Sequence, residues 1–199
     1  MKLILVRHGE THWNKARRVQ GGSSDIELND VGIRQANKLG LFLSNEKVAV
    51  VASSPLKRAV STGEAIARPH QLSVEVDDGF REIEVGQLEG LDASTLSTTF
   101  SNFLMQWWRG GGAERLPGGE SLIELQERSW ASTQRLLGDH RDGTIVVVSH
   151  YFVILAIMLK ALDLPLGHFT KFKVDPASIS ILEFADYGTR LVVFNDTFY

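Results

Sequence analysis

Two histidines and two arginines follow short apolar runs of the chain, where they could act together on one chemical group. Arg7 and His8 follow the first run. Arg58 comes shortly after the second, and His150 follows the third. A single Arg-His pair is most simply explained as part of a solvent-exposed turn. Several such side chains in one crevice, however, would concentrate positive charge that is costly to bury without a partner. A bound phosphate group would compensate this positive charge, because guanidinium groups can bind its oxygens in bidentate fashion.

The apolar runs must position these residues, and we predict that the runs are strands. They cover Lys2–Val6, Val48–Val51 and Thr144–Val148, without clear polar alternation. Short β-rich runs of this kind are typical of central strands in a parallel sheet that is buried on both faces. Ligands of such sheets bind outside the carboxyl ends of the strands. We therefore expect the residues that follow the runs to meet at one edge.

Helical segments are predicted between these strands. Asn29 or Asp30 can cap the first segment, and Pro55 fits as the first helical residue of a second segment that reaches about Arg68. A further helix covers roughly residues 150–162.

The longest predicted helix begins after Ser121, which can cap it. Every seventh residue along it is apolar, with two leucines alongside, which is typical of a buried helix face. These residues are Ile123, Trp130 and Leu137, with Leu122 and Leu136.

The C-terminal part contains two more predicted strands, near Ile179–Phe184 and Arg190–Phe194. Asp186-Tyr187-Gly188 between them is a reasonable hairpin turn, so at least one edge pairing is expected to be antiparallel. Strands that alternate with helices predict an α/β fold, a three-layer doubly wound, mostly parallel sheet flanked by helices. We expect a single domain over residues 1–199, with an inserted lid-like segment around residues 92–118.

Composition narrows the possible partners and location. The net charge of −3 argues against a general nucleic-acid or anionic-membrane surface. The absence of cysteine excludes disulfides, thiolate metal sites and cysteine nucleophiles. The longest apolar run, Tyr151–Leu159, is less than half of the about 20 residues that a membrane span needs. Residues 1–6 are too short for a signal-peptide core, so we expect a soluble cytoplasmic protein.

Six sequence blocks, in this order, resemble the histidine phosphatase superfamily, which also contains the cofactor-dependent phosphoglycerate mutases. The likeness extends over nearly the whole chain and implies a phosphoglycerate mutase-like fold. The blocks are Arg7-His8-Gly9-Glu10-Thr11 with Trp13-Asn14; Arg18 with Gln20-Gly21; Ser53-Ser54-Pro55-Leu56-Lys57-Arg58-Ala59 with Thr62; Arg81-Glu82 with Gly86 and Glu89-Gly90; Pro117-Gly118-Gly119-Glu120-Ser121; and Val148-Ser149-His150.

The resemblance implies a catalytic role for five residues. His8 would attack phosphorus to give a phosphohistidine, for which it must be neutral at the attacking nitrogen. Arg7, Arg58 and His150 would bind the nonbridging oxygens and stabilise the transition state. Glu82 would act as general acid and then as general base, with a raised pKa. These cations would replace a metal ion, and neither a metal nor a cofactor is expected.

Four further residues complete the predicted phosphate site. The resemblance implies that Asn14 and Gln20 supply neutral donors to the phosphate, although loop amides that satisfy backbone groups explain them equally well. Gly21 would allow its loop to approach the phosphate closely. Tyr151 stands where relatives usually have glycine, so its ring either reaches toward the pocket or packs beneath the helix. Glu84 and Glu89, the other candidate acids, are expected to be ordinary loop carboxylates.

The composition of the inserted segment helps to choose between the possible functions. It contains a conspicuous apolar and aromatic set, which contributes mostly to the core but also favours an organic, partly apolar phosphomonoester as substrate. The set is Phe100, Phe103, Leu104, Met105, Trp107 and Trp108. We therefore expect a phosphomonoester hydrolase, with a cofactor-dependent phosphoglycerate mutase as the alternative and a non-catalytic phospho-ligand binding protein as a third possibility. A homodimer is possible, through the C-terminal strands.

Overall fold

The computed structural model describes residues 1–140, 142–186 and 188–199, and its centre is a six-stranded mixed sheet. The sheet order is β3-β2-β4-β1-β5-β6. Strands β3, β2, β4 and β1 pair in parallel. Strand β5 pairs antiparallel with β1, and β6 pairs antiparallel with β5. The strands are β1 (Lys2–Arg7), β2 (Val48–Ser53), β3 (Val74–Val76), β4 (Thr144–Ser149), β5 (Ile179–Ala185) and β6 (Gly188–Asp196).

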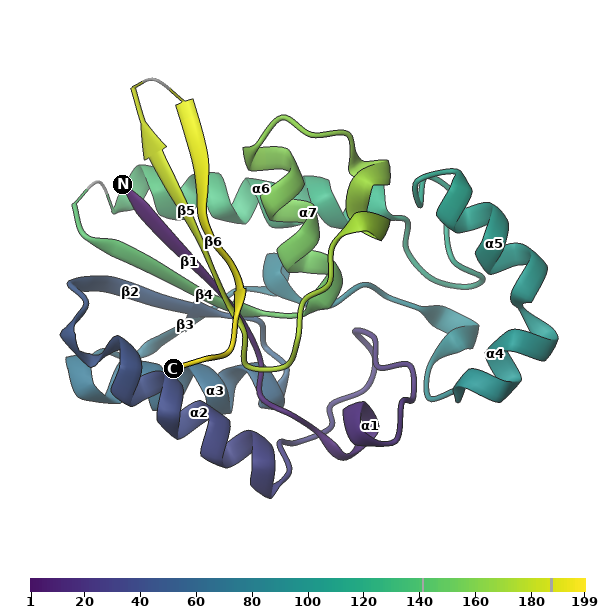
Figure 1. Cartoon of the computed structure of the whole chain (residues 1–199), viewed down its shortest axis with the longest axis horizontal. Coiled ribbons are helices and arrows are strands. Elements are labelled where there is room, and N and C mark those ends of the chain that lie inside the picture. Colours follow the sequence, from purple (N-terminus) through teal and green to yellow (C-terminus); the bar gives the residue numbers. More distant parts are fainter. Residues whose placement is uncertain (141, 187) are drawn as a thin grey trace.

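Helices cover both faces of this sheet, with α2 and α3 on one side and α6 and α7 on the other (Figure 1). This arrangement confirms the predicted α/β architecture. The helices are α1 (His12–Lys15), α2 (Asp30–Phe42), α3 (Lys57–Ala67), α4 (Ala93–Thr99), α5 (Ser101–Arg109), α6 (Leu122–Asp139) and α7 (Tyr151–Ala161). Short 3₁₀ turns are η1 (Leu43–Asn45), η2 (Arg68–His70), η3 (Asp78–Phe80), η4 (Gly86–Leu88) and η5 (Leu166–Lys171). None of the helices described is long and apolar enough to cross a membrane.

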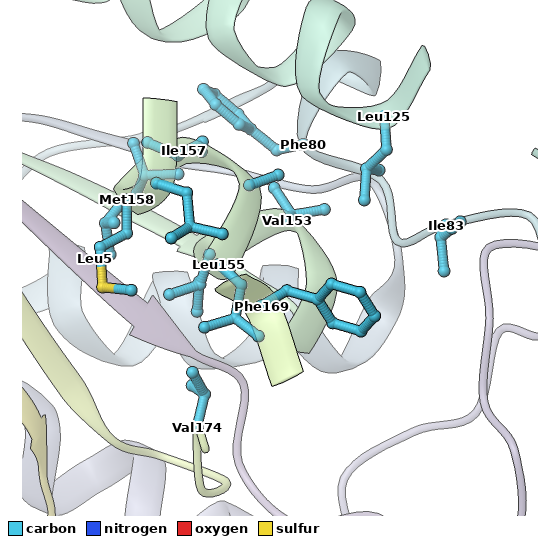
Figure 2. Packing of buried hydrophobic residues seen from close by; sticks show 14 of the residues in the cluster. Leu5, Phe80, Ile83, Leu125, Val153, Leu155, Ile157, Met158, Phe169 and Val174 are labelled. Carbon is cyan, nitrogen blue, oxygen red and sulfur yellow. The ribbon is translucent and has the colours of Figure 1, made fainter. Parts of the chain in front are cut away.

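The central strands lack polar alternation because both of their faces are buried. Leu3 and Leu5 of β1 join one hydrophobic cluster, together with α6 and α7, whereas Ile4 and Val6 join the cluster beneath α2 and α3. Successive side chains of a strand point to opposite faces, so each cluster receives every second residue. Figure 2 shows part of the first cluster, in which side chains of α7 gather beside Leu5.

Local capping explains where two of the helices begin. The Asn29 side chain accepts a hydrogen bond from Gly32 N (2.9 Å) at the start of α2, and Ser121 forms a capping box with Glu124 at the start of α6. Both predicted caps are confirmed. The prediction for Pro55 is wrong, because Leu56 keeps an extended backbone (ψ 134°) and α3 begins only at Lys57.

The predicted buried face of α6 is also wrong in part. Ile123 is exposed, and Trp130 is only half-buried. The buried face instead includes Ser129 and Thr133, with three leucines. Thr133 Oγ1 donates to Ser129 O (2.8 Å), so its hydroxyl is satisfied inside the helix and can be buried. A pattern of apolar residues alone could not include these two positions.

The C-terminal strands pair as expected, and they form one edge of the sheet. The pairing of β5 with β6 is antiparallel, from Ile179 with Asp196 to Ala185 with Gly188. Tyr187 of the predicted turn lies outside the described residues. The possible homodimer through these strands stays a prediction. At the opposite edge, β3 was not predicted, because three residues carry no readable period.

Candidate active site

Four of the five predicted catalytic residues lie at or after the carboxyl ends of three neighbouring strands. Arg7 ends β1 and His8 follows it, while His150 follows β4 and precedes α7. Arg58 lies in the first turn of α3, after β2. The centroids of the His8 and His150 rings are 5.0 Å apart. In Figure 1 these strand ends point toward α1 and the segment that carries α4 and α5.

His8 is held as a neutral ring with one free nitrogen. Its Nδ1 lies 2.7 Å from Gly9 O, and because a carbonyl only accepts, this contact places the proton on Nδ1 and the lone pair on Nε2. Burial, and then the charges of Arg58 and Arg7, lower the pKa of His8 well below its ordinary value. The geometry therefore favours a nucleophilic Nε2.

The two arginines are anchored by backbone carbonyls. Arg7 Nη1 donates to Val174 O (2.6 Å), whereas Arg58 donates to Ser24 O (2.7 Å) and Gly21 O (3.0 Å). Burial lowers the pKa of Arg58 to about 10, so the side chain stays charged at neutral pH. Neutral anchors leave both positive charges available for an anion.

His150 is fixed by a serine hydroxyl. Its Nε2 lies 2.7 Å from Ser54 Oγ, which also accepts from Leu56 N (3.3 Å) and can donate its own proton to the ring. When the hydroxyl donates to Nε2, the ring proton lies on Nδ1. Burial, followed by the charges of Arg58 and His8, lowers the pKa of His150 well below its ordinary value.

Several buried side-chain nitrogen atoms at the site are without a hydrogen-bond partner among the described residues. They are Arg7 Nε, Arg58 Nε, His150 Nδ1 and Gln20 Nε2. A buried donor that stays unsatisfied costs about 1–3 kcal/mol. An anionic ligand with several oxygens could satisfy such donors, which matches the chemistry of a phosphate.

Glu82 reaches the same site from the loop after η3. Its Oε1 accepts from Ile83 N (2.9 Å), and its Oε2 accepts a long hydrogen bond from Phe152 N (3.4 Å). Burial raises the pKa of Glu82, although the Ile83 amide and the charge of Arg58 act against this rise. A carboxyl group with a raised pKa can hold a proton for a leaving group.

An ion pair beneath the loop holds Glu82 in place. Arg128 of α6 forms a bidentate pair with Glu120, at 2.7 and 2.9 Å. The same guanidinium donates to Gly79 O (2.9 Å) and to Glu82 O (3.2 Å), and Glu120 accepts from Glu84 N (3.3 Å). Sequence reasoning missed Arg128, because only opposite charges eight residues apart hint at the pair.

A cavity of about 230 Å³ joins most of the predicted site. Its walls include Arg7, His8, Asn14, Gln20, Glu82 and Tyr151, and also Arg18, Val19, Ile83, Val85 and Phe152. Arg58 and His150 are buried next to His8 rather than in the cavity wall. No group of three or more metal-ligating side chains occurs in the part of the chain that the structure describes.

The two amides have the loop-stabilising role, and their donation to a phosphate stays a prediction. Asn14 Oδ1 accepts from Thr11 N (3.0 Å) in the capping box of α1, and Gln20 Oε1 accepts from Thr11 Oγ1 (2.9 Å). These contacts are the loop-stabilising role. Both amides nevertheless line the cavity, and the nitrogen of Gln20 is one of the unsatisfied donors.

Gly21 does not line the cavity, and the structure gives another reason for glycine there. A Cβ at Gly21 would lie 2.6 Å from Val85 Cγ2 and 2.8 Å from Ile83 O. The close approach is therefore to the loop after Glu82. Since Gly21 O accepts from Arg58, this contact positions the arginine; a direct contact of Gly21 with phosphate stays a prediction.

Tyr151 stands in the cavity wall, so the first of its two predicted arrangements is the one observed. Its ring lies over Arg7, with 5.4 Å from the guanidinium carbon to the ring centroid. Its hydroxyl donates to Phe172 O (3.0 Å).

Glu84 and Glu89 are loop carboxylates, as expected: Glu84 accepts from Ser23 Oγ, and Glu89 accepts from Gly21 N and Ser24 Oγ.

Comparisons with known proteins agree with this geometry. The model of the histidine phosphatase superfamily (branch 1) matches residues 3–197. A protein named probable phosphoglycerate mutase GpmB, of Proteus mirabilis, is 32% identical over 92% of this chain and 85% of its own length. Phosphoserine phosphatase 1 of Hydrogenobacter thermophilus is 32% identical over 99% of this chain and 93% of its own length.

The fold agrees as well. A solved structure of a mycobacterial glucosyl-3-phosphoglycerate phosphatase has a TM-score of 0.89 and 28% identity, and the match covers 98% of this chain and 99% of that one. The expected phosphoglycerate mutase-like fold is therefore confirmed. With a family model that matches almost its full length, this chain belongs to the histidine phosphatase superfamily, branch 1.

Proposed function

We propose that this protein is a metal-independent phosphomonoester hydrolase that acts through a phosphohistidine on His8. The observation that carries the proposal is the state of the His8 ring. Its Nδ1–H donates to Gly9 O, and its Nε2 has no hydrogen-bond partner among the described residues and lies near Arg7, Arg58 and Glu82. A neutral imidazole in a positively charged cavity is suited to attack the phosphorus of an anionic ester.

In the first step, a bond forms between His8 Nε2 and phosphorus while the ester P–O bond breaks. The leaving alkoxide takes a proton from Glu82, which becomes a carboxylate. Arg7, Arg58 and His150 stabilise the charge on the nonbridging oxygens. In the second step, the Glu82 carboxylate takes a proton from water, the water oxygen attacks phosphorus, and the P–N bond breaks. Inorganic phosphate leaves, and both residues return to their first state.

Residues 92–118 form the lid of a single domain in this proposal. They include α4 and α5, which stand to one side of the sheet in Figure 1, and Phe100, Phe103 and Leu104 pack against the main hydrophobic cluster. Apolar walls near the cavity favour an organic, partly apolar ester as substrate.

Covalent trapping tests the mechanism. Wild-type protein is incubated with a phosphomonoester and quenched in denaturant without acid, and phosphate that is stable to base is mapped by peptide mass spectrometry. We expect the label on His8, none in His8→Ala, and unchanged turnover in the presence of a chelator. If the wild type neither labels nor hydrolyses any of a broad panel of esters, the proposal of an enzyme is wrong.

A phosphoglycerate mutase is the second candidate, since several relatives carry the name probable phosphoglycerate mutase. The test compares isomerisation of 3-phosphoglycerate, with and without 2,3-bisphosphoglycerate, with the release of inorganic phosphate. We expect phosphate release to dominate. Rapid isomerisation that depends on the bisphosphate, with little phosphate released, would overturn the assignment as a hydrolase.

A further inference from the structure

A second recess adjoins the cavity that contains His8, and its walls are almost entirely aromatic. It has a volume of about 340 Å³ and is lined by Trp108, Tyr151, Phe152, Phe169 and Thr170. We call the space lined by these five residues the aromatic recess. Tyr151 and Phe152 also line the cavity of His8, so the two spaces share a wall. A molecule with its phosphate at His8 therefore has this recess beside it.

The walls of the recess are held in place by contacts among its own rings and with the core. The Tyr151 hydroxyl is bound to Phe172 O, and the rings of Tyr151 and Phe152 meet edge to face at 5.1 Å. Behind them, Trp107 contacts Phe152 and Phe169 and donates its Nε1 to Glu114 O (2.7 Å). A rigid apolar wall costs little further ordering when a ligand binds.

Trp107 and Trp108 are neighbours in α5 but have opposite environments. Trp107 is 2% exposed and belongs to the core, whereas Trp108 is 52% exposed and faces the recess. An exposed indole beside a reactive cavity offers a face on which another ring can stack. None of the five lining residues is charged, and Thr170 carries the one side-chain hydroxyl among them besides that of Tyr151.

We propose that the aromatic recess binds the organic group of the substrate, and that this group carries an aromatic ring. This inference rests on the proposed function, because it assumes that the phosphate of an ester is bound at His8. It assigns Trp108 and the Tyr151 ring to substrate selection. A small, highly charged ester would leave the recess unused and would gain nothing from its walls.

The test uses alkyl esters whose leaving oxygens are alike, so that chemical reactivity does not decide the result. We compare kcat/KM for 3-phenylpropyl phosphate, propyl phosphate and O-phosphoserine. 3-Phenylpropyl phosphate should be favoured over propyl phosphate by about tenfold or more, as apolar pockets commonly achieve. An equal rate for both, or a preference for phosphoserine, would overturn the inference.

Variants place the effect in the recess. Trp108→Ala should reduce the ratio of the two kcat/KM values by about threefold to tenfold, and Trp108→Phe should retain most of it. Phe42→Ala is the matched control, because Phe42 is an aromatic residue of α2 with a similar exposure of 50%. It should leave the ratio unchanged. A Trp108→Ala ratio equal to that of the wild type would contradict the assignment.

The two proposals fail in different ways. If propyl phosphate labels His8 and is hydrolysed, but 3-phenylpropyl phosphate has no higher kcat/KM, only the proposal for the aromatic recess is wrong. If no ester labels His8, the proposed function fails. Binding of the unreactive analogue 4-phenylbutylphosphonate, followed by tryptophan fluorescence and compared with butylphosphonate, then tests the recess without catalysis; equal affinity for the two compounds would overturn it.

Discussion

The cavity of His8 and the aromatic recess share a wall, but they are built from different parts of the chain. The first is lined by Arg7 and His8 at the end of β1, by the loops that carry Gln20 and Glu82, and by the shared start of α7. The arginines at this site are tied to backbone carbonyls. The second is made by α5, α7 and η5, whose rings contact one another. In the proposed enzyme, changes in the first region should slow alkyl esters to a similar extent, whatever organic group they carry. Changes in the second should alter the ranking of esters.

The largest expected effect comes from Glu82→Gln. Loss of the general acid should lower kcat for propyl and phenylpropyl phosphate by about 10²- to 10⁴-fold. For p-nitrophenyl phosphate, whose leaving group needs little protonation, the loss in the labelling step should be much smaller. Rapid-quench kinetics of phosphohistidine formation measure this difference. An equal loss for all three esters would mean that Glu82 is not the acid.

Arg128→Lys should have a smaller effect, because Arg128 acts through Glu82. Lysine cannot both pair with Glu120 in bidentate fashion and hold the carbonyls of Gly79 and Glu82. We expect kcat for alkyl esters to fall about tenfold, with a shift of the alkaline limb of the pH profile. In a Glu82→Gln background the same change should add little. A full additional loss there would show that Arg128 acts by another route.

The pH dependence of stability should also distinguish the two regions. The pKa of His150 is lowered in the folded protein, so its contribution is fully present above the unfolded value of about 6.5 and is lost as pH falls through the folded value. The free energy of unfolding of the wild type, relative to that of His150→Gln, should therefore fall between about pH 7 and pH 5. Urea titrations measure it. The difference between the wild type and Trp108→Phe should not change with pH. If the difference between the wild type and His150→Gln also stayed constant with pH, the lowered pKa of His150 would be contradicted.

The smallest effect is expected from Tyr151→Phe, which changes the shared wall without removing its ring. Loss of the hydrogen bond to Phe172 O should cost about 1 kcal/mol of stability, as thermal or urea unfolding would report. The ratio of kcat/KM for phenylpropyl and propyl phosphate should stay within about twofold of the wild type. A large change in this ratio would give the hydroxyl a direct part in selection.

The strand ends were readable from the sequence, and the supports of the site were not. His8 and His150 stand at junctions between β-rich runs and loops, so strand prediction also located them. Arg128 is distant in sequence from Glu82, and its role arises only when α6 packs beneath the loop. Trp107 and Trp108 are identical in type and adjacent, so composition could not show which of them would be buried.

The place of β1 in the sheet has a consequence for synthesis. Lys2 pairs with Thr144 on one side and with Glu183 on the other, so both neighbours of β1 are made long after it. During translation the segment that carries Arg7 and His8 must wait for nearly the whole chain before it can be ordered. Contacts between such distant residues slow folding and prolong the exposure of apolar strands. We therefore expect the segment that carries Arg7 and His8 to stay unordered, and its apolar strand to be most prone to aggregation, until β4 and β5 have been made.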